Sequence, residues 1–271
     1  MPLIDTCLGP LAVDDAGSGP PVVLWHCLFF DRTIWAPLAL ELRRDFRVVL
    51  IDGPGHGGSP PPLRRYSLED CGRAALEIMD ALGLERAVVG GISWGGMVAL
   101  RTALLAPQRV RSLLLLDTTA DAATLFERLR SGALAEVVER TGFPSFVIGA
   151  VFALTYAQAA RRRLPSLRRD LEQRFARLDR GAAAHATRAV LRDRTDVRAA
   201  LFSLRMPALV MVGSEDRTFP VAHAERLAAS LPRARLERLD GLGHLSIVEA
   251  PQRLTTLIAG FLREVQIPAE A

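Results

Sequence analysis

The amino-acid sequence predicts an α/β protein with a mostly parallel sheet and helices on both of its faces. Two observations carry this prediction: short apolar runs recur along the chain, and helical patterns lie between them. A third observation is a long stretch without any strand-like run, which interrupts the rhythm once. The 271 residues are enough for one large α/β domain with an insertion, or for two small domains.

The predicted strands are short apolar runs that are mostly bounded by Gly, Pro or Asp, as expected for strands buried on both faces of a parallel sheet. The opening "LIDTCLGPLAVDDAGSG" predicts an antiparallel hairpin that leads into this sheet. The run "ARLERLDG" (234–241) predicts its last strand. The strands between them are predicted at "PVVLWH" (21–26), "RVVLID" (47–52), "RAVVGG" (86–91), "VRSLLLLD" (110–117) and "PALVMVG" (207–213).

Helical patterns separate these runs, which indicates βαβ units. A closing helix is expected in "APQRLTTLIAGFLREV". The other helical patterns of the core are "WAPLALELRR", "SLEDCGRAALEIMDALGL", "GGMVALRTALLAP" and "VAHAERLAASL".

The alternation of strand-like runs and helical patterns stops between Thr118 and about Ala200, where only helical stretches appear. A segment of this length between two strands is too long for a plain loop. We therefore expect a helical insertion (118–200) over one edge of a core domain formed by 1–117 and 201–271. Breaks between its helices are expected at Gly142, Pro144, Pro165 and Gly181.

Composition excludes several classes of protein. The net charge is +4 and every basic residue other than histidine is Arg, but aromatic residues make up only 6% and the arginines are mixed with acids, so no nucleic-acid partner is expected. No apolar run reaches the ~20 residues of a membrane span, and the N-terminus lacks a signal-peptide pattern. The odd, widely spaced Cys7, Cys27 and Cys71 predict no disulfide framework and no metal site. We expect a cytoplasmic protein without a cofactor.

Ser93 lies in "VVGGISWGGMVAL", between a predicted strand and a predicted helix. Four glycines surround it, although glycine costs conformational entropy in regular structure. A sharp strand-to-helix turn explains them: Gly91 and Gly95 would stand where a Cβ meets neighbouring backbone. G-x-S-x-G in this setting is the nucleophile elbow, so Ser93 is the predicted nucleophile.

A serine nucleophile needs a base within hydrogen-bond reach and a third group that orients the base. His244 follows the last predicted strand in "LDGLGHLSIVEAP", which gives it the right order in the chain and a place at the sheet edge. The other histidines are expected in packing, turn or surface roles, with His26 also a candidate for lining the site. These are His26, His56, His185 and His223.

The predicted acid is Asp216 in "VMVGSEDRTFP", just after a buried strand, and Asp117 at the end of the preceding strand is the alternative. Asp52 and Asp240 are expected to accept from loop amides. The oxyanion of the attacked carbonyl also needs donors. We expect the backbone N–H groups of Trp94 and Leu28 to supply them.

With these motifs in place, the sequence resembles the α/β-hydrolase fold family over essentially its whole length, in the serine esterase and lactonase branch that includes β-ketoadipate enol-lactonase. The matching stretches are "WHCLFFDRTIW", "VVLIDGPGHGGSP", "VVGGISWGGMVALRTALLAPQRV", "VGSEDRTFP" and "LDGLGHLSIVEAPQRL". The resemblance implies an eight-stranded sheet with a helical cap inserted after strand six. One departure is His26-Cys27, where relatives commonly have His-Gly.

The predicted function is hydrolysis of a small carboxylic ester or an (enol-)lactone through a Ser-His-Asp triad and an acyl-enzyme. Two alternatives stay open: a cofactor-free haloperoxidase-like or carbon–carbon bond hydrolase on the same triad, and a ligand receptor without catalysis. Residues 118–200 hold fifteen Arg against nine Asp and Glu, which suits a substrate with a carboxylate; the alternative is that these arginines are solvated side chains on the helix surfaces. The candidate pocket residues are His26, Phe29, Phe146 and Arg140. The sequence leaves the oligomeric state open.

Overall fold

Eight strands form one sheet in the order β1-β2-β4-β3-β5-β6-β7-β8. The computed structural model describes residues 2–164 and 166–266. β1 and β2 form the expected antiparallel hairpin, β2 also pairs antiparallel with β4, and all other neighbours are parallel. The predicted α/β fold with a mostly parallel eight-stranded sheet is therefore confirmed. The strands are β1 (Leu3–Thr6), β2 (Gly9–Ala16), β3 (Pro21–Trp25), β4 (Arg47–Ile51), β5 (Ala87–Ile92), β6 (Val110–Leu116), β7 (Ala208–Gly213) and β8 (Ala234–Leu239).

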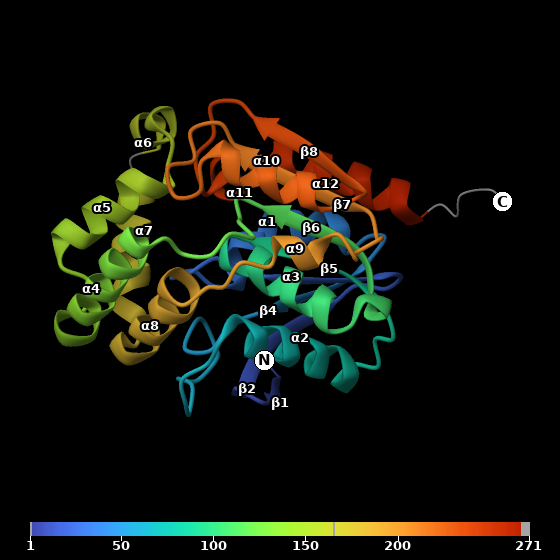
Figure 1. Cartoon of the computed structure of the whole chain (residues 1–271), viewed down its shortest axis with the longest axis horizontal. Helices are drawn as coiled ribbons and strands as arrows, with labels where there is room; N and C mark the ends of the chain where they lie inside the picture. Colours follow the sequence, from blue (N-terminus) through green and yellow to red (C-terminus); the bar gives the residue numbers. More distant parts are fainter. Residues whose placement is uncertain (1, 165, 267–271) are drawn as a thin grey trace.

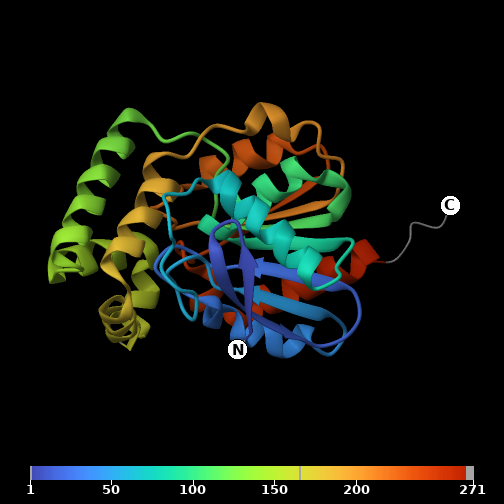
Figure 2. The same cartoon turned by 90° about the horizontal axis from the view of Figure 1, so that it is seen from below.

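Helices cover both faces of the sheet, and Figure 2 shows them as two groups with the strands between. On one face α1 packs against α12, and α11 also contacts α12. On the other face α2 packs against α3, and α9 contacts both α3 and α10. The helices of the core are α1 (Ala36–Leu42), α2 (Leu68–Ala81), α3 (Trp94–Leu105), α9 (Arg198–Leu201), α10 (Val221–Ser230), α11 (Ser246–Glu249) and α12 (Pro251–Gln266), with 3₁₀ turns η1 (Arg32–Trp35) and η2 (Pro107–Arg109).

The segment between β6 and β7 is helical, and its helices gather on one side of the molecule (Figure 1). We call residues 118–200 the inserted segment; its end forms most of α9, which packs against the core helices α3 and α10. Within it α4 packs against α8 and the π-helical turn η3, and α5 packs against α7. Its helices are α4 (Leu125–Thr141), α5 (Ser145–Thr155), α6 (Gln158–Arg163), α7 (Ser166–Arg177), α8 (Arg180–Thr187) and η3 (Arg188–Arg192).

Capping side chains, glycine and proline explain where several of these helices begin and end. The Thr124 hydroxyl and the Glu127 carboxylate form a capping box that begins α4, and Gly142 ends it with φ +75°. Pro144 is the N-cap of α5, so two of the predicted breaks are confirmed. The expected break at Gly181 is wrong, because α8 begins one residue earlier. The predicted break at Pro165 lies outside the described residues.

The buried centre of the sheet positions the functional loops. Every residue of β5 and of β7 is buried, as the continuous apolar runs predict. In open α/β sheets ligands bind beyond the carboxyl ends of the strands. The loops that leave β3, β5, β6, β7 and β8 at that edge carry the residues described next. Among the described helices none combines the length and apolarity that crossing a bilayer requires.

Candidate active site

Ser93 lies in the turn that joins β5 to α3. Its backbone has φ +55°, in the left-handed region that residues with a side chain rarely adopt. Two hydrogen bonds hold it there: the Ser93 N–H donates to the Leu116 carbonyl at 2.8 Å, and the Thr118 hydroxyl donates to the Ser93 carbonyl at 2.7 Å. Such a strained backbone persists only where its surroundings fix it, and it is common at functional sites.

The glycines beside Ser93 are required by close approach of the backbone. A Cβ on Gly95 would lie 2.0 Å from the Trp25 carbonyl oxygen, and one on Gly91 would lie 2.5 Å from Gly95 Cα. Neither contact can relax without moving backbone, because no flexible side chain is involved. The predicted reason for these two glycines is therefore confirmed.

His244 and Asp216 come from the loops after β8 and β7, and their side chains meet. His244 Nδ1 lies 2.8 Å from Asp216 Oδ2. The other carboxylate oxygen, Oδ1, accepts the backbone N–H groups of Thr218 at 2.8 Å and Phe219 at 2.9 Å. An Nδ1 proton given to a carboxylate leaves Nε2 of the imidazole as a free acceptor.

The charge of Asp216 also acts on the titration of His244. Burial by itself would lower the pKa of His244, but the charge and hydrogen bond of Asp216, together with the charges of Asp117 and Glu249, outweigh it, and the pKa is raised above its ordinary value. The pair is buried, with 4% of the His244 side chain and none of the Asp216 side chain exposed.

Asp117, the alternative acid, has other partners. Its Oδ1 accepts the Gly213 N–H at 2.9 Å, and its Oδ2 accepts the Ser246 hydroxyl at 2.5 Å. These bonds tie the end of β7 to the chain just after His244. Burial, followed by the charge of Asp216, raises the pKa of Asp117 to about 8.

The loop after β3 carries Leu28, one of the two predicted oxyanion donors. The Phe29 N–H donates to His56 Nε2 at 3.3 Å, and the Phe30 N–H donates to the Cys27 carbonyl at 3.2 Å. The N–H of Leu28, which precedes both residues, finds no protein acceptor in residues 2–164 and 166–266. Phe29 takes φ +67°, which turns the chain here.

The backbone N–H of Trp94 is the second predicted donor. It opens α3, and the first N–H groups of a helix have no preceding turn to accept them. The positive end of the helix dipole favours negative charge at the same place.

Two buried histidines fasten the loops after β3 and β4 to each other. His26, at the end of β3, accepts the Gly53 N–H on Nε2 at 2.8 Å, while His56 accepts from the β3 loop. Since each Nε2 is an acceptor, each Nδ1 carries the proton and donates it, to the Cys27 carbonyl at 2.7 Å and the Pro54 carbonyl at 2.9 Å. Burial lowers the pKa of His26 to about 4 and that of His56 to about 3.

A cavity of about 290 Å³ opens over Ser93 and His244, and both residues line it. The β3 loop forms one wall, and α4, α5 and the loop after β7 form the others. Its lining is mainly apolar, with a few charged side chains. The apolar members include Leu28, Phe29, Phe30, Leu134, Phe146, Val147, Leu154 and Phe219, and the charged ones are Glu127, Arg130, Arg194 and Arg217.

The predicted pocket residues fall into two pairs. Phe29 and Phe146 line the cavity, Phe146 as an exposed residue. His26 and Arg140 are absent from the lining of the described cavity, and this corrects the expectation for both. Arg140 is exposed near the end of α4 and pairs with Glu136 at 2.6 Å. His26 points into the loop after β4 instead.

The arginines that line the cavity are Arg130, Arg194 and Arg217, not the predicted Arg140. Arg194 is buried, with its guanidinium 2.9 Å from Glu127 and 5.4 Å from the centre of the Phe219 ring. The excess of Arg in the inserted segment was the available signal, but it does not say which arginine points inward.

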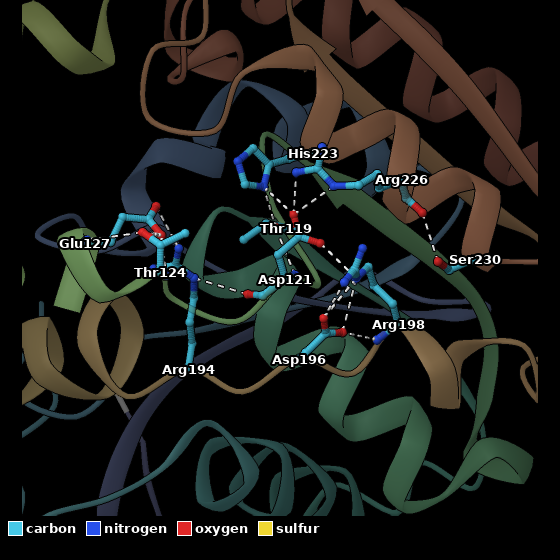
Figure 3. A network of polar contacts seen from close by, with 10 residues as sticks. All are labelled: Thr119, Asp121, Thr124, Glu127, Arg194, Asp196, Arg198, His223, Arg226 and Ser230. Carbon is cyan, nitrogen blue, oxygen red and sulfur yellow. Dashed lines mark hydrogen bonds and ion pairs between the residues drawn. The ribbon is translucent and has the colours of Figure 1, made fainter.

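Arg194 belongs to a polar network that joins the inserted segment to the core (Figure 3). At its centre the carboxylate of Asp121 pairs with Arg198, His223 and Arg226. Arg194 donates to the Asp121 carbonyl at 3.3 Å. Because His223 and Arg226 lie on α10, the network fixes the start of the inserted segment against that helix.

The arrangement has the parts that nucleophilic acyl transfer needs: a hydroxyl on a strained turn, an imidazole held by a carboxylate, and backbone donors beside a cavity. The residues described here contain no cluster of three or more His, Cys, Asp or Glu side chains that could hold a metal ion.

Curated proteins of related sequence include esterases and lactonases. The chain is 35% identical to a pimeloyl-[acyl-carrier protein] methyl ester esterase of Aromatoleum aromaticum, over 90% of this chain and 98% of that protein. It is 28% identical to 3-oxoadipate enol-lactonase 1 of Acinetobacter baylyi, over 92% and 91%.

Solved structures that are similar to this chain also include an esterase and a lactonase. A thermophilic esterase from Thermogutta terrifontis, solved with malate bound, superposes with a TM-score of 0.91 at 30% identity, over 97% of this chain and 98% of that one. The enol-lactonase from Burkholderia xenovorans LB400 superposes with a TM-score of 0.89 at 26% identity, over 97% and 100%. The family model for the alpha/beta hydrolase fold matches residues 20–251. The chain therefore belongs to the α/β hydrolase fold family.

Proposed function

We propose that this chain is a serine hydrolase that cleaves small carboxylic esters or lactones through Ser93, His244 and Asp216. The observation that carries the proposal is the 2.8 Å contact between His244 and Asp216 beside a cavity that Ser93 also lines. The relatives named as an esterase and as lactonases support the same substrate class.

In the proposed reaction, His244 Nε2 takes the proton of the Ser93 hydroxyl as Oγ attacks the carbonyl carbon of the substrate. Asp216 keeps the imidazole in the required tautomer and stabilises the imidazolium. The N–H groups of Leu28 and Trp94 bind the oxyanion, and one such donor is typically worth about 2.7–4 kcal/mol of barrier. His244 returns the proton to the leaving alkoxide, which leaves an acyl group on Ser93. Water, deprotonated by His244, then releases the acid; a lactone opens by the same steps.

We propose further that the inserted segment acts as a cap that selects the substrate. Its side chains form much of the cavity wall, through Leu134 of α4 and Val147 of α5 among others. Apolar walls suit an acyl or ring group, and the cations Arg130 and Arg217 suit a carboxylate on the substrate.

A fluorophosphonate probe tests the proposed nucleophile. The native protein should gain the mass of one phosphonyl group on the peptide that contains Ser93, and Ser93→Ala should gain none. Turnover of p-nitrophenyl esters or lactones should fall in the same variant by about 10⁴–10⁶-fold in kcat. The exposed Ser203 supplies a control, because Ser203→Ala should still be labelled. A native protein that stays unlabelled, or a Ser93→Ala variant that keeps turnover, contradicts the proposal.

A further inference from the structure

A second cavity, of about 240 Å³, lies beside the first. Two segments of chain line both cavities in turn. In one, residues 154–155 line the first cavity and Tyr156 lines the second. In the other, residues 244–245 line the first cavity and residues 247–248 line the second. A third segment contributes one residue to both, and that residue is Phe30. The two cavities are therefore neighbours, and Phe30 lies in the wall between them.

Phe30 is held firmly in this wall. It is 5% exposed, and the guanidinium carbon of Arg174 lies 5.2 Å from the centre of its ring. Arg174 is itself anchored to the loop that carries Phe30, through Asp31 Oδ2 at 2.5 Å and the Thr33 hydroxyl at 3.0 Å. A cation held over an aromatic face is attracted by the ring, which fixes the ring as well as the arginine.

We propose that Phe30 determines specificity: its side chain ends the substrate cavity on the side of α7 and so limits the length of the substrate chain that fits. The proposal rests on the proposed function, because it concerns the substrate of the same site. The second cavity is the space that a longer chain would enter if the wall were removed. Its walls carry the apolar Ile34 and Leu171, which suit methylene groups, beside the charged Asp170 and Arg174.

The expected gain can be scaled from burial of apolar surface. Each methylene that passes from water into an apolar site is worth about four-fold in kcat/KM. Two further methylenes past a missing Phe30 ring should therefore change the preference for long over short chains by about ten-fold or more.

The experiment measures kcat/KM for p-nitrophenyl esters of acids with two to twelve carbons. In Phe30→Ala the chain length at which kcat/KM stops rising should move up by at least two carbons. The ratio of kcat/KM for the ten-carbon ester over the four-carbon ester should rise by about ten-fold or more over the native ratio. The ratio is used because the Phe30 side chain also borders the first cavity.

Val248→Phe supplies the matched control, because Val248 lines the second cavity and does not line the first. In the native background this substitution should leave the chain-length preference unchanged. Combined with Phe30→Ala, it should refill the second cavity and reverse the gain. Leu134→Ala enlarges the first cavity from another wall, so any gain that it gives should be insensitive to Val248→Phe.

Two outcomes overturn the proposal: a chain-length preference that Phe30→Ala does not move, or a gain that Val248→Phe does not reverse. Phe30→Leu keeps an apolar side chain in the core and is used if Phe30→Ala does not fold; it should shift the preference in the same direction by a smaller amount. Labelling of Ser93 separates the two proposals. If Ser93 is labelled and short esters turn over while the preference stays fixed, the proposed function holds and this inference fails.

Discussion

The core and the inserted segment of this molecule contribute to the candidate active site in different ways. In the core, β5 and β7 are buried at every residue, and a Cβ at Gly91 or Gly95 would collide with backbone. In α4 of the inserted segment, by contrast, Leu125, Phe126 and Leu129 are largely exposed. The backbone of the core fixes where Ser93, Asp216 and His244 lie, whereas side chains of the inserted segment shape the cavity around them. We therefore propose that the core carries the chemistry, and that the inserted segment selects the substrate together with Phe30 of the β3 loop.

The largest expected effect separates the two carboxylates of the core. Asp216→Asn should lower kcat by about 10⁴-fold, because an amide cannot fix the histidine tautomer or stabilise the imidazolium. Asp117→Asn should have a far smaller effect. The Asp117 carboxylate accepts from the Gly213 N–H and the Ser246 hydroxyl and is not hydrogen-bonded to the His244 ring, and burial raises its pKa, so a neutral amide of the same shape replaces it at lower cost. Steady-state kinetics of the two variants decide this, and a larger loss in Asp117→Asn would move the acid to the end of β6.

The next effect is on the pH dependence of activity. His244 must be neutral to accept the serine proton, and its pKa is raised above the ordinary value of about 6.5. The acid limb of kcat/KM should therefore have its midpoint above pH 6.5 and fall about ten-fold per pH unit below it. Asp216→Asn removes the main charge that raises this pKa, so the midpoint of the residual activity should move to lower pH. A profile that stays flat down to about pH 4 would be incompatible with a histidine base.

The smallest effect belongs to the inserted segment and the cavity mouth. A substrate with a free carboxylate should have a kcat/KM about ten-fold above that of its neutral methyl ester, because a charge-assisted bond to Arg is worth roughly 1.5–3 kcal/mol. Arg130→Ala or Arg217→Ala should reduce this preference. Arg140→Ala is the matched control on the same helix, since Arg140 is exposed and pairs with Glu136. Equal rates on the two substrates would mean that the arginines do not select charge.

The same contrast explains how far the sequence could predict the structure. The run "RVVLID" became β4 and "PALVMVG" became β7 within a residue at each end, since a strand buried on both faces needs an unbroken apolar run. Ser93, Asp216 and His244 could be placed in the loops after β5, β7 and β8, because each follows a predicted strand. In α4 no such constraint acts: Arg130 and Arg140 are ten residues apart, about 15 Å along the helix, and only Arg130 reaches the cavity.

Contacts between loops could not be predicted from the sequence either. The bond from the Phe29 N–H to His56, and the wall that Phe30 forms between two cavities, depend on how the loops after β3 and β4 meet. None of these three residues lies in a periodic apolar pattern. The left-handed backbone of Phe29 could not be predicted either, because glycine is the usual signal for that conformation.

The paired loop histidines have a consequence for the proton balance of unfolding. His26 and His56 have pKa values near 4 and 3 in the folded chain but near 6.5 once it unfolds, so unfolding between these limits takes up protons. Their contribution to stability is complete above about pH 6.5 and is lost as the pH falls through the folded-state values. His244 has the opposite sign, because its raised pKa stabilises the folded chain at low pH and this gain is lost as the pH rises. On the proposed mechanism, mild acid should therefore protonate His244 and stop turnover, while His26 and His56 make the folded chain less resistant to denaturant.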